Sequence, residues 1–247
     1  IAGGPCATFN PEPLAAFVDA FIVGEGEEVI HELLDTYYKA KGAGVTRHLL
    51  LRELANIPGV YVPRFYQPSY NADNTLAGMV ALDGVPARIQ RRWVKDLDAY
   101  PGESVIVTKN TEFEDMYLIE IARGCGRHCR FCMAGYCFRR PRVRSLDRVA
   151  AALERAAPLR RKVGLVGAAI SDYPEIDKLC DMILARGMTL SVASLRADSL
   201  TPRLAEALAA SGHRTITLAP EAGSARLRRV INKNITDDHL RQAVSLA

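Results

Sequence analysis

The residues best suited to chemistry in this chain are three cysteines on one short segment, Cys125, Cys129 and Cys132. Their close spacing lets a single loop present all three thiolates to one centre. Thiolates are soft ligands, which favour zinc, copper(I) and iron–sulfur clusters. Three thiolates can hold three corners of a 4Fe–4S cluster and leave the fourth iron open to another ligand. The spacing therefore predicts an iron–sulfur cluster with one open coordination position.

A structural zinc site is the competing interpretation, with Cys137 as the fourth ligand. Zinc sites usually pair their ligands as two Cys-x-x-Cys knuckles with a longer stretch between them. Here the first spacing is wider than a knuckle and the sequence has no second knuckle, so iron is the preferred metal. A zinc site would make the chain a non-catalytic α/β module that binds a partner.

Cysteine usage also indicates the cellular compartment. Six cysteines among 247 residues are too sparse for a disulfide scaffold, and four of the six fall within thirteen positions. That pattern is typical of metal chemistry under reducing conditions, so we expect a cytoplasmic protein. The apolar runs fall well short of the roughly 18 residues of a membrane span, so we expect no membrane partner.

The charge of the chain is unevenly distributed. A composition of 49% hydrophobic and 24% charged residues is globular and excludes disorder along the whole chain. Of the net charge of +4, the segment 123–148 carries +7 and the rest of the chain −3. A single Arg-rich segment indicates a local anionic ligand, a cofactor or an interface, whereas a general basic surface would indicate nucleic acid. Its run from Arg139 to Arg144 can contact RNA or neutralise a negatively charged cluster.

Short apolar strands separated by helices must position the cysteine loop. The predicted strands are 117–121, 163–166, 190–193 and 215–218, and the predicted helices between them are 146–157, 176–186 and 202–210. This alternation indicates parallel βαβ units. We therefore predict an α/β fold with a partial (β/α) barrel of parallel strands over 116–247, and the cysteines follow its first strand, where barrel active sites form. We expect dimerisation, or the preceding segment, to cover the strand edge beside 215–218.

The chain before the barrel divides into two further parts. Residues 1–41 are predicted to end a Rossmann-like domain, with a strand-to-loop exit at 1–5, a strand at 20–23 and a helix that reaches Lys41. Residues 42–115 are rich in Pro, Gly and Asn and too long for a simple loop, so we interpret them as an irregular linker subdomain with isolated strands at 90–94 and 105–107. Because the sequence starts and stops inside apparent elements, we expect an excised piece of a longer protein.

The cysteine spacing, with the aromatic Phe131 just before Cys132, resembles the signature of the radical S-adenosylmethionine (SAM) enzymes. The resemblance implies that the three cysteines bind a 4Fe–4S cluster whose open iron is chelated by the amino and carboxylate groups of SAM. It also implies that one electron, from a flavodoxin- or ferredoxin-type reductant, cleaves SAM and produces a radical that abstracts hydrogen from a substrate. The strand and βα repeats extend this resemblance over 116–247.

A second resemblance lies at the start of the chain. Gly3-Gly-Pro5 and the stretch 21–27 are similar to the last part of the cobalamin-binding Rossmann domain that precedes many radical SAM barrels. This implies that 1–41 is the C-terminal part of such a domain, and that cobalamin is a cofactor of the full-length protein.

The resemblance implies SAM contacts from Phe131, Gly167, Ser194, Arg196 and Glu221. Gly167 stands where family members carry a Gly-Gly-Glu-like turn, but the Glu is missing, so backbone contact and a simple packing turn are equal alternatives. The guanidinium of Arg196 suits the SAM carboxylate, and pairing with Asp198 or Glu221 is its alternative role. Glu221 lies in a turn similar to the Glu-x-Gly-Ser turn of methylthiotransferases and cobalamin-dependent members.

The leading hypothesis is a radical SAM enzyme that starts radical chemistry on an unidentified substrate, with unknown catalytic residues. A second hypothesis is an enzyme that transfers methyl or methylthio groups to RNA by the same chemistry, favoured if the run from Arg139 to Arg144 faces the barrel mouth.

Overall fold

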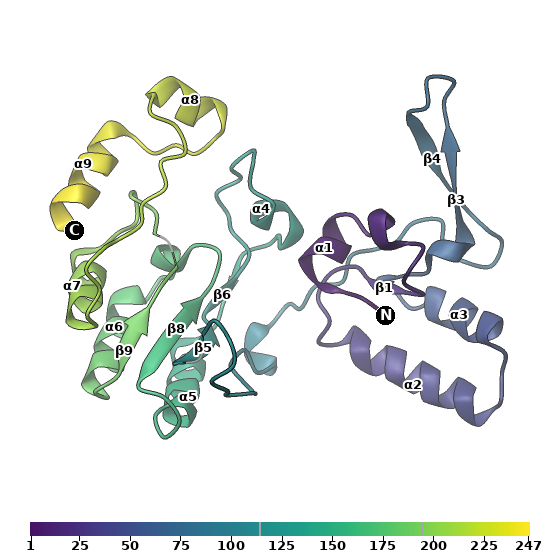
Figure 1. The fold of residues 1–247 in the computed structure, drawn as a ribbon, viewed down its shortest axis with the longest axis horizontal. Coiled ribbons are helices and arrows are strands. Elements are labelled where there is room, and N and C mark those ends of the chain that lie inside the picture. Colours follow the sequence, from purple (N-terminus) through teal and green to yellow (C-terminus); the bar gives the residue numbers. More distant parts are fainter. Residues whose placement is uncertain (114, 194) are drawn as a thin grey trace. The chain divides into compact units, whose positions relative to one another are not determined.

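The computed structural model describes residues 1–113, 115–193 and 195–247, which form two compact units, Ile1–Lys95 and Asp96–Ala247 (Figure 1). The boundary between these units lies inside the irregular segment 42–115, so both units contain part of that segment. Its first part is bound to the N-terminal unit by packing: Leu51, Leu54 and Phe65 share one buried core with Phe21 and Val29.

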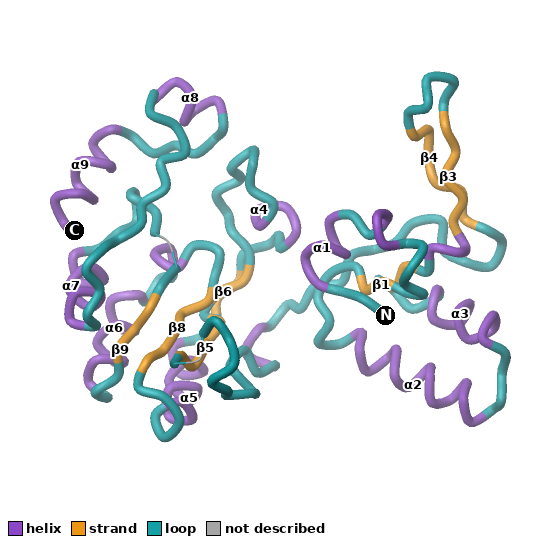
Figure 2. The backbone as a smooth tube through the Cα atoms, viewed as in Figure 1, coloured by secondary structure: helices purple, strands orange, loops and turns teal. Residues whose placement is uncertain are grey.

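The N-terminal unit consists of helices and two small antiparallel sheets, one of which is a hairpin that extends away from the helices (Figure 2). Its elements are α1 (Gly4–Phe9), η1 (Glu12–Leu14), β1 (Phe21–Ile22), α2 (Val29–Gly42), α3 (Arg47–Ala55), β2 (Val60–Tyr61), η2 (Pro63–Phe65), β3 (Tyr66–Tyr70) and β4 (Leu76–Ala81). Strand β1 pairs with β2, and β3 forms a hairpin with β4. The expected loop at residues 1–5 is a helix from Gly4 onward, because Pro5 occupies its first turn, where a missing N–H costs nothing.

Residues near Arg92 close this unit. Only a bridge between Gly24 and Arg92 forms where a strand at 90–94 was expected. The Arg92 guanidinium makes ion pairs with Glu28, the N-cap of helix α2, and with Glu32 in the first turn of that helix. The buried carboxylate of Glu25 accepts a 2.8 Å hydrogen bond from the backbone N–H of Val94. These polar contacts explain why the chain up to Lys95 stays with the first unit.

The second unit is built on a parallel sheet in the order β5–β8–β9, formed by β5 (Met116–Glu120), β8 (Lys162–Val166) and β9 (Thr189–Ser191). Helices α5 (Leu146–Ala156), α6 (Ile176–Ala185) and α7 (Pro202–Ala210) pack on one face of this sheet (Figure 1). Alternate strand residues, such as Tyr117 and Ile119, are buried against these helices. Sequential parallel strands with helices between them form the predicted partial (β/α) barrel.

The expected fourth strand is reduced to a single parallel bridge between Leu195 and Leu218. Strand β9 ends at Ser191, so its backbone offers the segment 215–218 little to pair with, although Ile216 and Leu218 still pack against the core. The stretch 105–107, also expected as a strand, is a loop in the structure, and the nearby Glu103 makes a bridge to Ile119.

Shorter elements surround the sheet of the second unit. They are η3 (Leu97–Ala99), β6 (Ala122–Arg123), α4 (Ala134–Cys137), β7 (Arg142–Val143), η4 (Ile170–Asp172), α8 (Ala225–Val230) and α9 (Asp237–Leu246). Strands β6 and β7 pair antiparallel and enclose the cysteine loop between them. Throughout the described part of the chain, no helix combines the length and the apolarity needed to cross a bilayer.

Candidate metal centre

The cysteine loop begins where the first barrel strand ends. The N–H of Ile121 still bonds to the carbonyl of Val166, at 2.9 Å, and β6 then leads into the loop at Gly124. Gly124 has a φ of +83°, and a Cβ at this position would lie 2.0 Å from the carbonyl oxygen of Phe138. Only glycine fits such a close backbone approach, so the sequence Gly124-Cys125 allows the return segment to close over the loop.

The three cysteines lie on this loop at the carboxyl end of the sheet. Cys129 is buried, whereas Cys125 and Cys132 are partly exposed. The N–H of Cys132 donates to the carbonyl of Cys129, at 3.1 Å, which turns the chain between these two thiols. Three soft thiol donors on one loop suit an iron–sulfur cluster by ligand type and spacing. Among the described residues, however, no three His, Cys, Asp or Glu side chains are grouped closely enough to hold a metal ion. The three thiols therefore lie on one loop without converging on a common point.

Cys137, the fourth ligand of the zinc interpretation, ends the short helix α4 and is buried. Among the residues that the structure describes, Cys137 belongs to no group of three His, Cys, Asp or Glu side chains that could hold a metal ion.

The segment that follows helix α8 in the sequence binds one side of the cysteine loop. The side-chain amide of Asn232 donates to the carbonyl of His128 at 2.9 Å, and the N–H of Arg130 donates to the carbonyl of Ile231, also at 2.9 Å. The guanidinium of Arg130 bonds to the carbonyl of Val230. Residues 128–130 are therefore fixed to the segment that follows helix α8.

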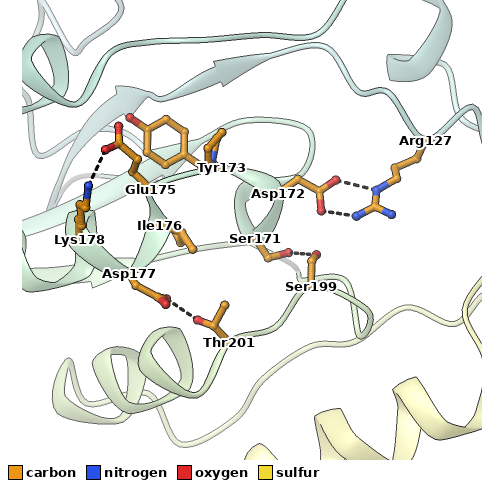
Figure 3. Close-up of a pocket in the computed structure, with 11 residues that line it drawn as sticks. Arg127, Ser171, Asp172, Tyr173, Glu175, Ile176, Asp177, Lys178, Ser199 and Thr201 are labelled. Atoms are coloured by element: carbon orange, nitrogen blue, oxygen red, sulfur yellow. Dashed lines mark hydrogen bonds and ion pairs between the residues drawn. The ribbon is translucent and has the colours of Figure 1, made fainter.

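Ion pairs hold the other side of the loop. Nε and Nη2 of Arg127 lie 2.8 and 2.6 Å from the two carboxylate oxygens of Asp172 (Figure 3), and Nη1 lies 3.2 Å from a carboxylate oxygen of Asp198. Burial alone would raise the pKa of Asp172, but hydrogen bonds from Arg127 and Ser199 outweigh it and hold this pKa below its usual value. Burial likewise opposes ionisation of Asp198, and Arg196 together with Arg127 lowers its pKa.

The expected SAM contacts fall into two groups. Glu221, with a φ of +67°, accepts a 3.1 Å hydrogen bond from Nζ of Lys233, and that nitrogen lies 5.7 Å from the ring centroid of Phe131. Lys233 thus brings Phe131 of the cysteine loop and Glu221 to one place, and its carbonyl accepts a hydrogen bond from Arg196. Ser194 lies outside the described residues.

Gly167 and Arg196 occupy the ends of neighbouring strands. A Cβ on Gly167 would lie 3.0 Å from Cδ1 of Ile170 and 3.2 Å from the carbonyl of Ala122, so a larger residue would crowd this turn. Arg196 makes two hydrogen bonds to Asp198, which is the alternative role considered for it.

Sequence reasoning did not single out Lys233, Arg127 or Asp172 as site residues. For Lys233 the available signal was a basic residue after the Glu-x-Gly-Ser turn. For Arg127 and Asp172 the sequence carries no local signal, because 45 positions separate the two partners.

Two cavities lie in the second unit. One of about 750 Å³ is lined by Arg127, Asp172 and the first turn of α6; Arg127 pairs with Asp172 there, and Lys178 pairs with Glu175 (Figure 3). A smaller one of about 350 Å³ lies on the sheet face opposite the helices, with largely apolar walls from β5, β8 and β9 that include Leu118, Val166 and Gly167. Barrel enzymes bind ligands at the carboxyl ends of their strands, and both cavities include residues at or just after the ends of β8 and β9.

Comparison with family models gives two matches. A model described as radical SAM proteins, N-terminal, matches residues 1–63, and the model of the radical SAM superfamily matches residues 119–247. The second match covers the end of β5, the cysteine loop, strands β8 and β9 and the helices α5, α6 and α7.

Individual proteins are also similar along the whole chain. An uncharacterized protein of Methanocaldococcus jannaschii is 33% identical over 255 residues, covering 100% of this chain and 48% of that protein. An uncharacterized methyltransferase of Pyrococcus horikoshii is 26% identical over 263 residues, covering 100% of this chain and 50% of its own length. The chain therefore spans about half the length of these relatives.

Among solved structures, the radical S-adenosylmethionine methyltransferase TsrM from Kitasatospora setae, with cobalamin and a 4Fe–4S cluster bound, has a similar fold. The TM-score is 0.60 at 17% sequence identity, and the match covers 99% of this chain and 46% of TsrM. At this identity the likeness concerns the fold.

Proposed function

The chain belongs to the radical SAM superfamily, and from that premise we propose that it carries the cluster-binding half of a cobalamin-associated radical SAM methyltransferase. The superfamily's cofactors are a 4Fe–4S cluster and SAM, and the protein is an enzyme of this class. The observation that carries the proposal is the position of the three cysteines: they share one loop at the carboxyl end of β5, beside the turns that follow β8 and β9.

Cys125, Cys129 and Cys132 would hold three irons of the cluster and leave the fourth open to SAM. When bound, the cluster supplies the electron for reductive cleavage of SAM. The chain's own residues position the ligand: Phe131 and Glu221 lie around Lys233, and the narrow turn at Gly167 offers backbone groups at close range.

Methyl transfer is the reaction class that we propose for the whole protein. Two similar proteins support it by name, since one is called a methyltransferase and TsrM is a radical SAM methyltransferase. The match of residues 1–63 to an N-terminal radical SAM model, and the cobalamin in TsrM, support cobalamin as a further cofactor of the whole protein.

The RNA-modifying alternative depends on the run from Arg139 to Arg144, in which Arg139 and Arg140 are exposed and Arg144 is buried, while several arginines of the wider Arg-rich segment pair within the unit. Arg123 and Arg144 both pair with Glu120, and Arg127 pairs with Asp172 and Asp198. The guanidinium groups of Arg123 and Arg144 are largely buried, so they cannot contact a phosphate backbone.

The remaining partners stay predictions. We propose a flavodoxin- or ferredoxin-type protein as electron donor and the cytoplasm as location, because thiol ligands need a reducing compartment. Dimerisation over an unpaired strand edge also remains a prediction, which size-exclusion chromatography with light scattering would check.

Anaerobic reconstitution with iron and sulfide tests the proposal. The wild-type chain should bind about four irons, and Cys125→Ala, Cys129→Ala and Cys132→Ala should each lose the cluster's visible absorption. Cys137→Ala is the matched control and should retain it. A requirement for Cys137 equal to that for the other three would overturn the open-iron assignment.

A further inference from the structure

Arg127 lies between the first two proposed cluster ligands and reaches two other loops at once. Its partner Asp172 ends the turn after β8, and its partner Asp198 follows β9. The same two loops carry Gly167 and Arg196, which are expected to contact SAM. One guanidinium thus connects the segment that would hold the cluster to the segments that would hold its ligand.

The two carboxylates are fixed independently of Arg127. The hydroxyls of Ser171 and Ser199 are 2.8 Å apart, which joins the loop that carries Asp172 to the loop that carries Asp198 (Figure 3). Asp198 also receives both donors of Arg196, at 2.9 and 2.8 Å. The bidentate pair with Asp172 constrains both the distance and the orientation of the Arg127 guanidinium. Because the acceptor carboxylates are already held by other contacts, this pair restricts the position of the Arg127 backbone.

The contacts of Asn232 and Ile231 hold the opposite side of residues 127–130. The loop is therefore held from two directions, although it has no regular structure between β6 and α4. Irregular segments lose conformational entropy when they are ordered, and these two sets of contacts offset that loss next to Cys129.

We propose that Arg127 is a positioning residue, which fixes the cysteine loop against Asp172 and Asp198 and thereby sets the distance between the cluster and the SAM-binding turns. The inference rests on the proposed function for its purpose, but the clamp itself is a property of the chain without cofactor. The two parts are tested separately.

Hydrogen exchange on the cluster-free full chain tests the clamp. Arg127→Met should raise exchange at the amides of 125–132 about tenfold and leave β8 unchanged, because one charged tie of the loop is lost. Arg203→Met is the control, because the exposed fraction of the Arg203 side chain is 37%, against 38% for Arg127. Each of these arginines pairs with two carboxylates, at 2.6 and 3.2 Å. The control should not change exchange in 125–132.

Binding of SAM to the reconstituted chain tests the purpose. Arg127→Met should keep its iron content but bind SAM about tenfold more weakly, and the change that SAM causes in the EPR spectrum of the reduced cluster should be smaller. Arg127→Lys keeps the positive charge but cannot donate two parallel hydrogen bonds to one carboxylate, so it should recover only part of the affinity for SAM. Asp172→Asn should reproduce the effect, and it serves as the second variant if Arg127→Met fails to fold.

Each result has a distinct meaning. Unchanged exchange in Arg127→Met would overturn the clamp, and unchanged SAM affinity and EPR spectrum in a reconstituted Arg127→Met chain would overturn its role toward the cofactor. If the wild-type chain takes up no iron, the proposed function fails, while the exchange experiment still decides whether Arg127 holds the loop.

Discussion

Arg196 and Asp198 form a two-pronged ion pair within a span of three residues, with donor–acceptor distances of 2.9 and 2.8 Å. The same carboxylate accepts a hydrogen bond from Arg127. Asp198 is therefore the point where the segment after β9 and the cysteine loop meet, and both ion pairs depend on its charge.

Acid should weaken this part of the protein. The pKa values of Asp172 and Asp198 are lowered in the folded chain, so their contribution to the free energy of unfolding is complete above their ordinary pKa near 4 and is lost as the pH falls through the folded values. The double variant Asp172→Asn, Asp198→Asn should be less stable than wild type at pH 7, and the difference should shrink below about pH 4. Urea unfolding between pH 7 and 3 measures this, with the exposed Asp238→Asn as control. A difference independent of pH would contradict the prediction.

Gly124 should tolerate no side chain. Alanine at this position would place its Cβ 2.0 Å from a carbonyl oxygen in addition to adopting a φ of +83°. Gly212 separates the two effects, since its φ is +86° and no described atom lies within 4 Å of a Cβ there. Gly212→Ala should cost about 1 kcal/mol of unfolding free energy, whereas Gly124→Ala should cost more and also lower iron uptake. Equal losses of unfolding free energy in the two variants would show that Gly124 does not lie this close to the carbonyl of Phe138.

Arg144 should contribute far more to stability than a surface arginine does. It is 2% exposed and donates to the carbonyls of Leu97 and Tyr100 and to the carboxylate of Glu120. Arg144→Met removes these three hydrogen bonds from a buried site, while Arg123 still pairs with Glu120, so we expect a loss of about 1–3 kcal/mol of unfolding free energy. Arg155→Met removes a pair that is 45% exposed on the arginine side and should cost about 0–1 kcal/mol. Denaturant midpoints of the two variants provide the comparison, and similar midpoints would contradict it.

Thiol labelling should distinguish the cysteines outside the loop. Burial raises the pKa of Cys180 to about 11, so at pH 8 this thiol is protonated as well as inaccessible. Cys6 is exposed and should react with iodoacetamide in the folded chain, while Cys180 should react only after unfolding. Peptide mass spectrometry with and without urea measures both, and Cys6→Ser identifies the fast site. Rapid labelling of Cys180 in the native chain would show that α6 opens readily.

Much of the second unit could be predicted because its signals are local. Ser145 and Thr201 cap the helices that begin at Leu146 and Pro202, and each side chain accepts the hydrogen bond expected of such a cap. The apolar run at 163–166 became the central strand β8, which pairs with β5 on one edge and with β9 on the other. The segment 215–218 is also rich in β-branched residues but lacks a partner backbone long enough to pair with, and composition alone does not reveal that.

The site was predictable only where its residues are adjacent in sequence. The cysteine spacing is visible in ten letters, whereas the clamp depends on Arg127, Asp172 and Asp198, which meet through the order of strands in the sheet. Lys233 likewise reaches Phe131 across about a hundred residues. An ion pair of this kind follows from tertiary packing, and one sequence offers no pattern from which to derive it.

The strand order β5–β8–β9 has a consequence for synthesis on the ribosome. Within this sheet each strand pairs with the sheet strand made before it, and the helix between them covers the same face, so the sheet can grow in the direction of translation. Contacts between neighbouring units close short loops, which favours rapid assembly. The cysteine loop emerges after β5 alone, but Asp172 and Asp198 emerge only later, and Ile231 and Asn232 later still. Its final shape must therefore wait until these later segments of the nascent chain have been made.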